Sequence, residues 1–246
     1  MILAAAATLI GASVQSATGF GFALILSPAM LALLEPPEAV TALLVLGFAL
    51  NLLLLFGEGG EPRAVRWRAV GPMLLAALPG LGAGLVLLAV MSKPALQLAV
   101  GAGVIAAAIL QARGGPDLAT AGEPTLGSAC AVGLASGALT TSTTLSGPPS
   151  VLWLQSQGVT PAELRASLAA SFLGLSVAGG AMLAAGGVLA LEPAVVLPLL
   201  AITAVGHLVG ARAFRRLDPL RMRWAVLGLV VAAGLASLVA GFAGVA

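Results

Sequence analysis

Charged residues divide this sequence into eight uncharged segments, and the lengths of these segments constrain the fold more than any other feature. Six of them have 19 to 26 residues, which suits one helix across a hydrocarbon core about 30 Å thick. The other two, 1–34 and 124–162, are too long for one ordinary span and slightly too short for two spans and a turn. Since only 8% of residues are charged, against about 25% in soluble domains, we predict an all-α, polytopic membrane protein.

Both long segments are interrupted near the middle by small and hydroxyl residues. The first interruption covers residues 15–21, and the second comprises Ser136, Gly137 and residues 140–147. Irregular backbone at membrane depth is tolerated only where it is buried in protein or lines a cavity. We therefore predict two broken, re-entrant hairpins, over 1–34 and 124–157, whose tips face each other near the middle of the bilayer.

The distribution of arginine determines how the segments are threaded. Basic clusters lie in the loops 58–68 and 212–223, and loops rich in Lys and Arg stay in the cytoplasm. Eight single spans would place these loops on opposite sides, whereas two re-entrant hairpins place both in the cytoplasm. Ten of the eleven basic residues are then cytoplasmic, and Lys93 and the N-terminus lie outside.

Each half of the chain is then a hairpin followed by three transmembrane helices, and the second half is inverted relative to the first. The first repeat, 1–113, has predicted helices at 38–57, 69–91 and 94–112; the second, 124–246, has them at 161–183, 193–212 and 223–245, after a linker at 114–123. Internal matches with equal spacing support a duplication: Ser16 and Pro28 with Ser136 and Pro148, Glu38 and Asn51 with Glu163 and Ser176, and Pro72, Gly80 and Gly84 with Pro198, Gly206 and Gly210.

Inverted repeats with interrupted helices are typical of secondary transporters, which hold substrate near the membrane midplane. The outgoing half-helices present free N–H groups and a positive dipole end, which favour an anion, and we expect tip Ser and Thr residues to cap them. Small residues also serve tight helix packing, but the clustering of hydroxyls exceeds that need. The predicted substrate-binding residues are Gln15, Ser16, Thr18, Gly19, Phe20, Gly21, Asn51, Ser136, Gly137, Thr140, Thr141, Ser142, Thr143, Thr144, Ser146 and Gly147.

A few residues outside the tips have alternative interpretations. His207 is the only histidine and a candidate for proton coupling, because imidazole titrates near neutral pH; the alternative is a satisfied histidine at the membrane interface. Charged residues that flank the hairpins are expected to be interfacial anchors, with gating as the alternative: Glu35, Glu38, Glu163 and Arg165. Isolated glycines such as Gly80 and Gly84 are expected to allow close helix packing.

The sequence offers little for other classes of function. It has no phosphate-binding loop, no buried acidic pair and no basic patch for nucleic acid, and its lone Cys130 cannot form an internal disulfide. We expect a non-enzymatic protein without metal or cofactor, surrounded by lipid and able to form a homo-oligomer, that uses an ion or proton gradient. A passive anion channel, an intramembrane enzyme using Ser136 and His207, and a membrane scaffold for a partner chain are the alternatives.

Several of these residues carry a resemblance to a known family. They are the run from Gln15 to Pro28 with its Gly19-Phe20-Gly21 core, the stretch from Glu38 to Asn51, the stretch from Ser136-Gly137 to Gly147-Pro148-Pro149, and Gly158, Pro161 and Arg165. This pattern resembles the TauE/SafE sulfite exporter family, also called TSUP. The resemblance implies transport of sulfite, organosulfonates and related anions across the prokaryotic cytoplasmic membrane. Phe22, Ala23 and the Thr/Ser series stand where the family has more glycine, which indicates a polar pocket for an oxyanion.

Overall fold

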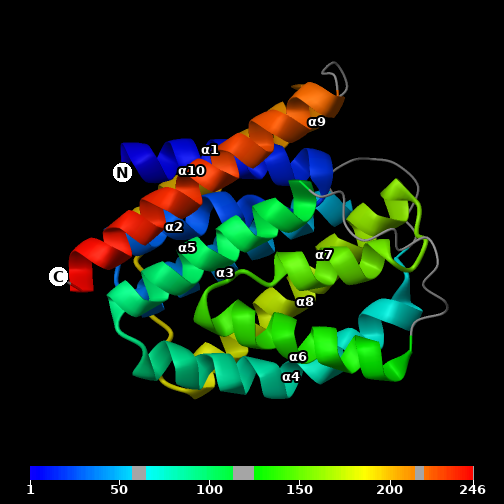
Figure 1. The fold of residues 1–246 in the computed structure, drawn as a ribbon, viewed down its shortest axis with the longest axis horizontal. Coiled ribbons are helices and arrows are strands. Elements are labelled where there is room, and N and C mark those ends of the chain that lie inside the picture. The colour runs from blue at the N-terminus through cyan, green and yellow to red at the C-terminus, as the bar shows by residue number, and fades with distance from the viewer. Residues whose placement is uncertain (57–64, 113–124, 214–218, 246) are drawn as a thin grey trace.

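The computed structural model describes residues 1–56, 65–112, 125–213 and 219–245, and within these ranges the chain is helical throughout its regular structure (Figure 1). The linker 114–123 and residues Arg63, Arg113, Arg215 and Arg216 lie outside the described residues. The helices are α1 (Ile2–Thr18), α2 (Phe22–Leu33), α3 (Pro36–Phe56), α4 (Trp67–Val90), α5 (Lys93–Ala112), α6 (Leu126–Ser142), α7 (Gly147–Gln155), α8 (Pro161–Ala185), α9 (Pro193–Ala213) and α10 (Pro219–Val245).

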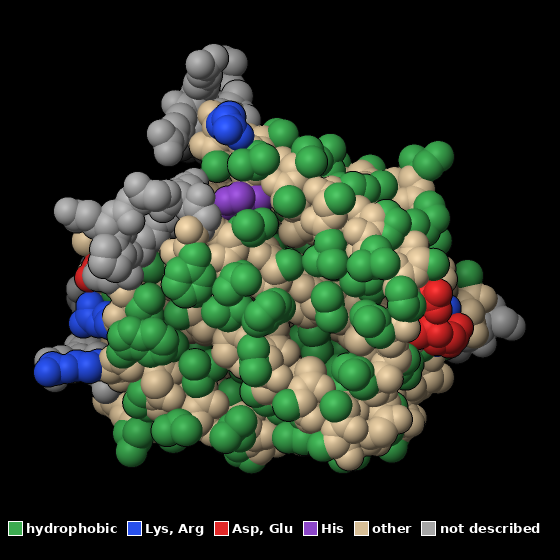
Figure 2. Space-filling model, turned by 180° about the vertical axis from the view of Figure 1, so that it is seen from behind, with side chains coloured by type: hydrophobic (Ala, Val, Ile, Leu, Met, Phe, Trp, Pro, Cys, Tyr) green, Lys and Arg blue, Asp and Glu red, His purple; other side chains and the backbone are tan. Residues whose placement is uncertain are grey.

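Six of the described helices are long and apolar enough to cross a membrane: α3, α4, α5, α8, α9 and α10. Their exteriors are apolar, with Leu75, Val90 and Val239 among the most exposed large side chains. In Figure 2 hydrophobic side chains cover most of one face, and the charged side chains lie toward its edges. A continuous apolar surface of this extent suits lipid and not water, so the all-α, multi-pass fold class is confirmed.

The four remaining helices form the two broken hairpins. In the first, α1 ends at Thr18, because Gly19 adopts a left-handed conformation with φ 90°, and α2 begins after Gly21 at φ 111°. Such dihedrals suit glycine, which has no Cβ. In the second, α6 ends at Ser142 and α7 begins at Gly147. Tip 1 is therefore residues 19–21 and tip 2 is residues 143–146, both shorter than the interruptions that we predicted.

The reason for the shorter tip 2 is local hydrogen bonding. The Thr140 hydroxyl donates to Ser136 O at 2.6 Å, and the Ser142 hydroxyl donates to Ala138 O at 2.6 Å. Bonds of this kind to the carbonyl four residues earlier let Ser and Thr remain in a helix without an unpaired hydroxyl. The prediction that the interruption begins at Ser136 is therefore wrong, because residues 136–142 belong to α6.

The first helix of each hairpin packs against a helix from the other half of the chain. α6 lies alongside α4 (Figure 1), and α1 lies alongside α9. Glycines permit both contacts, as expected: a Cβ added to Gly84 would fall on Ala138 O, and one added to Gly206 would lie 2.8 Å from Leu9 O. The hairpins are thereby held by opposite halves, while the inverted symmetry of those halves stays a prediction.

The helix ends next to the two arginine-rich loops lie at the same end of the molecule. In Figure 1 the N-terminus, the C-terminus and the turn from α4 to α5 lie at the left, and the start of α4 and the end of α9 lie at the right. Arg66 and Arg212 belong to these right-hand ends. The described basic residues beside the two loops, 58–68 and 212–223, are thus at one end of the molecule.

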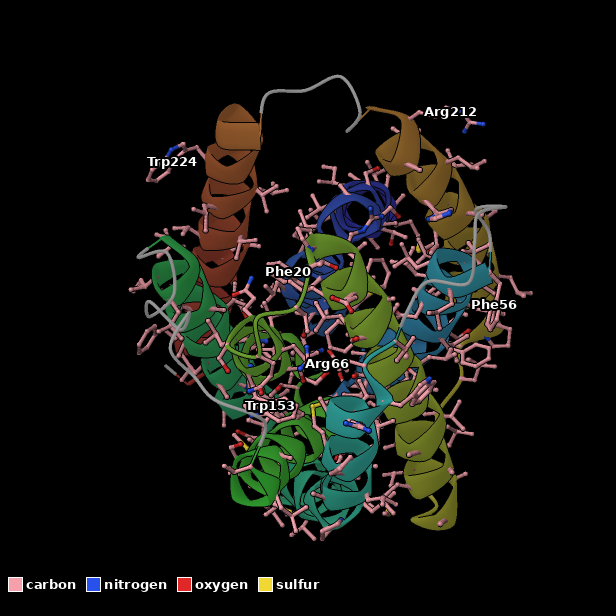
Figure 3. All side chains as sticks on the ribbon, turned by 90° about the vertical axis from the view of Figure 1, so that its right-hand side faces the viewer. Phe20, Phe56, Arg66, Trp153, Arg212 and Trp224 are labelled. Atoms are coloured by element: carbon pink, nitrogen blue, oxygen red, sulfur yellow. The ribbon has the colours of Figure 1, made fainter. Side chains whose placement is uncertain are left out.

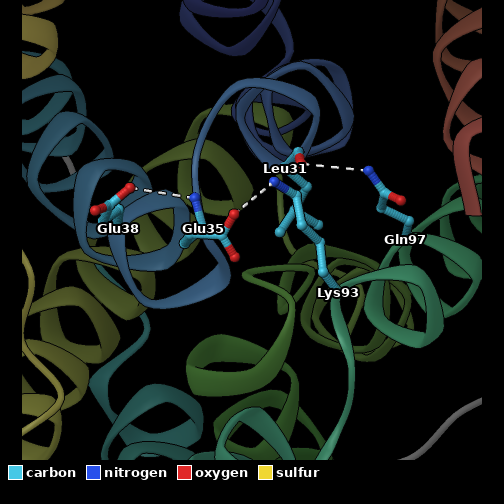
Figure 4. A network of polar contacts seen from close by, with 5 residues as sticks. All are labelled: Leu31, Glu35, Glu38, Lys93 and Gln97. Carbon is cyan, nitrogen blue, oxygen red and sulfur yellow. Dashed lines mark hydrogen bonds and ion pairs between the residues drawn. The ribbon is translucent and has the colours of Figure 1, made fainter. Parts of the chain in front are cut away.

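The turns at the left-hand end are tied together by polar contacts (Figure 4). Lys93 Nζ donates to Glu35 Oε1 at 3.1 Å, and Glu38 Oε2 accepts from the Glu35 amide at 3.2 Å. Deeper in, Gln97 Nε2 donates to Leu31 O at 3.3 Å. These contacts join the end of α2 to the starts of α3 and α5, so the first hairpin is fixed at its open end.

Candidate functional site between the two hairpin tips

A small cavity lies where the tips meet. Its solvent-accessible volume is about 60 Å³, room for a few water-sized groups, because one water needs about 10–15 Å³ by this measure. Both tips, α3 and α8 contribute to its wall, whose residues are Gln15, Phe20, Gly21, Phe22, Ala23, Leu24, Leu43, Leu44, Gly47, Asn51, Thr140, Thr144, Leu145, Ser146, Gly147, Pro148, Phe172, Leu175 and Ser176. The cavity suits a ligand of a few heavy atoms.

Phe20 stands where the two halves of the core meet. It packs against a hydrophobic cluster that contains α2 and α3 residues and also against a second cluster that contains α4, α7 and α8 residues. In Figure 3 it lies inside the ring of helices, whereas Phe56, Arg212 and Trp224 point outward at the rim. Phe20 therefore forms an apolar wall of the cavity that touches both hairpins.

Gln15 connects three elements at one side of the cavity. Its Nε2 donates to Asn51 Oδ1 at 2.9 Å, and its Oε1 accepts from the Phe22 amide at 3.2 Å. Asn51 Nδ2 in turn donates to Gly47 O at 2.7 Å. The Phe22 amide is one of the four that the start of α2 leaves without a helical partner, so Gln15 does for α2 what a capping hydroxyl usually does.

The hydroxyls of tip 2 do not cap α7, and those of tip 1 do not cap α2. No side-chain hydrogen bond caps either helix from its N-cap residue, Gly21 or Ser146. The Thr18 hydroxyl instead donates to Val14 O or Phe20 O, and the Thr143 hydroxyl donates to Leu139 O. The capping prediction is therefore wrong, because these hydroxyls find carbonyl acceptors within or next to their own helices.

Thr144 is held in an unusual backbone conformation. It has φ 61°, the one positive value among the described non-glycine residues, and a β-branched residue there is a genuine outlier. Its hydroxyl donates to Thr143 O at 2.6 Å, and the same Thr143 O accepts from the Ser27 hydroxyl of α2 at 3.1 Å. Strain of this kind persists only where surrounding structure over-determines it, and it clusters at functional sites.

Eight of the sixteen predicted site residues line the cavity: Gln15, Phe20, Gly21, Asn51, Thr140, Thr144, Ser146 and Gly147. Five of the others make structural contacts in α6 or just after it. Ser136 Oγ lies 2.9 Å from Ser150 Oγ, and Thr141 donates to Leu81 O of α4. A Cβ on Gly137 would fall on Ala77 O of the same helix, while Ser142 and Thr143 bond to carbonyls of α6.

The remaining three, Ser16, Thr18 and Gly19, lie at the end of α1 and do not line the cavity. Ser16 Oγ lies 2.9 Å from Nδ1 of His207, and Arg165 donates from its guanidinium to Ser16 O. The Arg165 side chain also packs over Gly19. A cation is favourable here, because the C-terminal end of α1 carries a partial negative charge.

The surroundings of His207 and Arg165 depend on tertiary contacts. His207 is only 3% exposed and is a buried partner of α1, as the alternative of a satisfied histidine predicts. Arg165 is half-buried, and its guanidinium donates to Ser16 O of α1. Whether either residue lies at the membrane interface stays a prediction. Ser136 and His207 also pair with different partners, Ser150 and Ser16, which disfavours a catalytic pair.

The sequence analysis did not predict the apolar residues that line the cavity. Phe172 and Leu175 come from the middle of α8, and Leu43 and Leu44 come from α3; nothing in an apolar run distinguishes a cavity wall from core. Ser176 could have been predicted from the sequence, since the proposed duplication makes it the counterpart of Asn51. Within the described ranges, no three His, Cys, Asp or Glu residues gather as a metal site would require.

Six membrane-length helices, two broken hairpins and a small cavity between their tips define a class, the helical membrane transport proteins with interrupted-helix sites. The chain matches a family model described as "Sulfite exporter TauE/SafE" over residues 3–237. Since this is nearly the whole chain, the protein belongs to the TauE/SafE sulfite exporter family. Neither a curated protein nor a solved structure matches it.

Proposed function

We propose that the protein is a secondary transporter of small anions, sulfite or an organosulfonate, in the cytoplasmic membrane of a prokaryote. The observation that carries the proposal is the cavity to which both hairpin tips contribute. In an alternating-access cycle, substrate binds between the tips and the two halves of the chain open in turn to each side. The N-terminus then lies outside, and the loops 58–68 and 212–223 lie in the cytoplasm, as the arginine distribution favours.

The start of α2 favours an anion. Helix N-termini carry a partial positive charge and unpaired N–H groups, and Phe22, Ala23 and Leu24 at the start of α2 all line the cavity. The start of α7 is poorer in donors, because Pro148 and Pro149 have no N–H. Hydroxyls replace amides there, and Ser146 lies directly before that helix.

A second hollow beside the cavity indicates where a substrate could enter it. It is lined by residues of α3 and α8, among them Thr41, Phe48 and Gly180, and it shares Leu44 and Ser176 with the cavity. Leu44 and Ser176 therefore stand between the two spaces. A small shift of α3 against α8 would join them, and this is the movement that we assign to opening on one side.

Binding of anions to the purified protein tests the proposal. Sulfite, methanesulfonate and acetate are added to the wild type, and the change in Tm is measured. Ser146→Ala is expected to weaken the response about 10- to 100-fold in affinity, which corresponds to one hydrogen bond to a charged ligand. Ser142→Ala is the matched control, because its hydroxyl bonds to Ala138 O and does not line the cavity. A folded protein that responds to no anion would contradict the proposal.

Flux measurements separate a transporter from a channel. In proteoliposomes, a transporter exchanges labelled sulfite with saturation and without electrical conductance above background. An anion channel shows conductance that scales with the gradient and does not saturate in the same range. Conductance abolished by Ser146→Ala would assign the same site to a passive pore instead.

A further inference from the structure

The cavity has no charged wall. Its nineteen lining residues include no Lys, Arg, His, Asp or Glu. Two described cationic or titratable side chains, His207 and Arg165, contact Ser16 of α1 and do not line the wall. Dipoles and neutral donors stabilise one negative charge far better than two, because burying each uncompensated charge is costly.

The wall of the cavity has hydrogen-bond donors to offer a ligand. Gln15 and Asn51 each use one side-chain N–H, on Asn51 Oδ1 and Gly47 O, and each carboxamide has a second N–H to offer. Ser146, 8% exposed, has a hydroxyl with no hydrogen-bond partner in the part of the chain that the structure describes. These groups all face a space that holds a few heavy atoms, so they suit the oxygens of an anion.

Two hydroxyls in the wall can only accept. Thr140 and Thr144 each donate their single proton to a backbone carbonyl, Ser136 O and Thr143 O, at 2.6 Å. A carbonyl has no proton to give, so the direction of both bonds is fixed. The lone pairs that remain on these two oxygens can accept a hydrogen bond from a ligand that itself carries a proton.

We infer that the site takes an oxyanion with a single negative charge that retains one proton, so that sulfite binds as hydrogen sulfite. The inference rests on the proposed function and specifies the ionic form of its substrate. Donors around Gln15, Asn51 and Ser146 bind the anionic oxygens, and Thr140 and Thr144 accept the O–H. A doubly charged sulfite has no proton for these acceptors and would lack a cationic partner.

Binding isotherms in a pH series test this with the full-length protein. The probes are sodium sulfite, methanesulfonate, which stays a monoanion without an O–H, and sulfate, which stays a dianion. Hydrogen sulfite loses its proton near neutral pH, so the apparent Kd for total sulfite should rise about tenfold per pH unit above that point. The Kd for methanesulfonate should stay constant, and sulfate should not compete.

Thr144→Val provides a second measurement. It removes one acceptor and should weaken sulfite binding about tenfold at acidic pH, the size of one hydrogen bond, with little effect on methanesulfonate. A sulfite Kd that is flat or falls as pH rises, sulfate that competes, or methanesulfonate that follows the same pH profile would overturn the inference and leave anion transport standing. A folded protein that binds none of the three would overturn the proposed function itself.

Discussion

The two hairpins occupy corresponding places in the chain and meet at one cavity, but they are built from different chemistry. Tip 1 has two left-handed glycines, and Gln15 near the end of α1 accepts from the first amide of α2 with its carboxamide oxygen. Tip 2 has hydroxyl residues, one strained threonine and a helix that begins with two prolines. The first hairpin thus offers backbone and carboxamide N–H groups. The second offers hydroxyl groups, of which Ser146 can donate while Thr140 and Thr144 can only accept. The two hairpins therefore contribute different kinds of polar group to one site.

The largest expected effect concerns what both hairpins share, their glycine contacts. Gly84→Ala in α4 would place a methyl group on Ala138 O of α6, and Gly210→Ala in α9 would place one on Ser13 O of α1. Each is expected to lower the free energy of unfolding by about 2–3 kcal/mol. Gly82→Ala is the matched control, because a Cβ there meets nothing within 4 Å and should be neutral or stabilising by up to about 1 kcal/mol.

Equilibrium unfolding in detergent, followed by circular dichroism, measures these changes. If Gly84→Ala destabilises the protein and Gly210→Ala does not, close glycine contacts hold only the second hairpin. That result would contradict the claim that both hairpins are held in the same way. Equal effects of Gly82→Ala and Gly84→Ala would mean that the α4–α6 interface is looser than the structure indicates.

The next largest expected effect comes from the carboxamide pair of Gln15 and Asn51, which has no equivalent in the second hairpin. Gln15→Leu removes the acceptor of the Phe22 amide and the partner of Asn51, and each buried polar group left unpaired costs about 1–3 kcal/mol. Asn51→Leu should cost a similar amount, and the double variant should cost less than the sum, because the partners are removed together. Additive costs in a double-mutant cycle would show that the pair is not coupled.

A smaller effect of opposite sign is expected at tip 2. Thr144→Gly relieves a positive φ, and the gain of about 1 kcal/mol is partly offset by the greater freedom of glycine in the unfolded chain. Stability should therefore stay equal or rise slightly, while anion binding weakens because the hydroxyl is lost. Tm with and without sulfite measures both quantities. A large loss of stability would show that the Thr144 hydroxyl is mainly structural.

The smallest effects concern the turns by which the hairpins lead into the next helices. Glu163 and Thr160 form a reciprocal capping box at the start of α8, whereas at α3 Glu38 accepts from the Glu35 amide only. Thr160→Ala should therefore cost about 1 kcal/mol, and Glu35→Ala should cost less, since its exposed ion pair with Lys93 contributes at most about 1 kcal/mol. Thermal unfolding at low and high salt separates the two contributions, and the reverse order would contradict the comparison.

The sequence predicted the elements whose causes are local. Spacing between charges located the long helices, and Gly19 and Gly21 marked tip 1, because few other residues adopt such dihedrals. The prediction for the start of tip 2 was wrong. A run of Ser and Thr residues indicates a break in the helix unless their hydroxyls bond to carbonyls of the preceding turn, and the sequence does not show those bonds. Phe172 and the contacts of Ser16 with His207 and Arg165 depend on helices more than a hundred residues away. Contacts between distant helices do not appear in the local sequence pattern. About half of the predicted site residues therefore line the cavity, and the others do not.

The exchange of partners between the halves has a consequence for biosynthesis. α1 leaves the ribosome long before α9, but Ser13 of α1 bonds to Gly206 of α9, 193 residues later in the chain. The first hairpin must therefore wait in the bilayer, its small-residue face covered only by lipid or by a chaperone, until α9 has been made. α6 does not wait in this way, because α4 is already inserted when it emerges. The order of synthesis thus makes the second hairpin the earlier one to assemble, and a chain that stops before Pro193 leaves the first hairpin without its main neighbour.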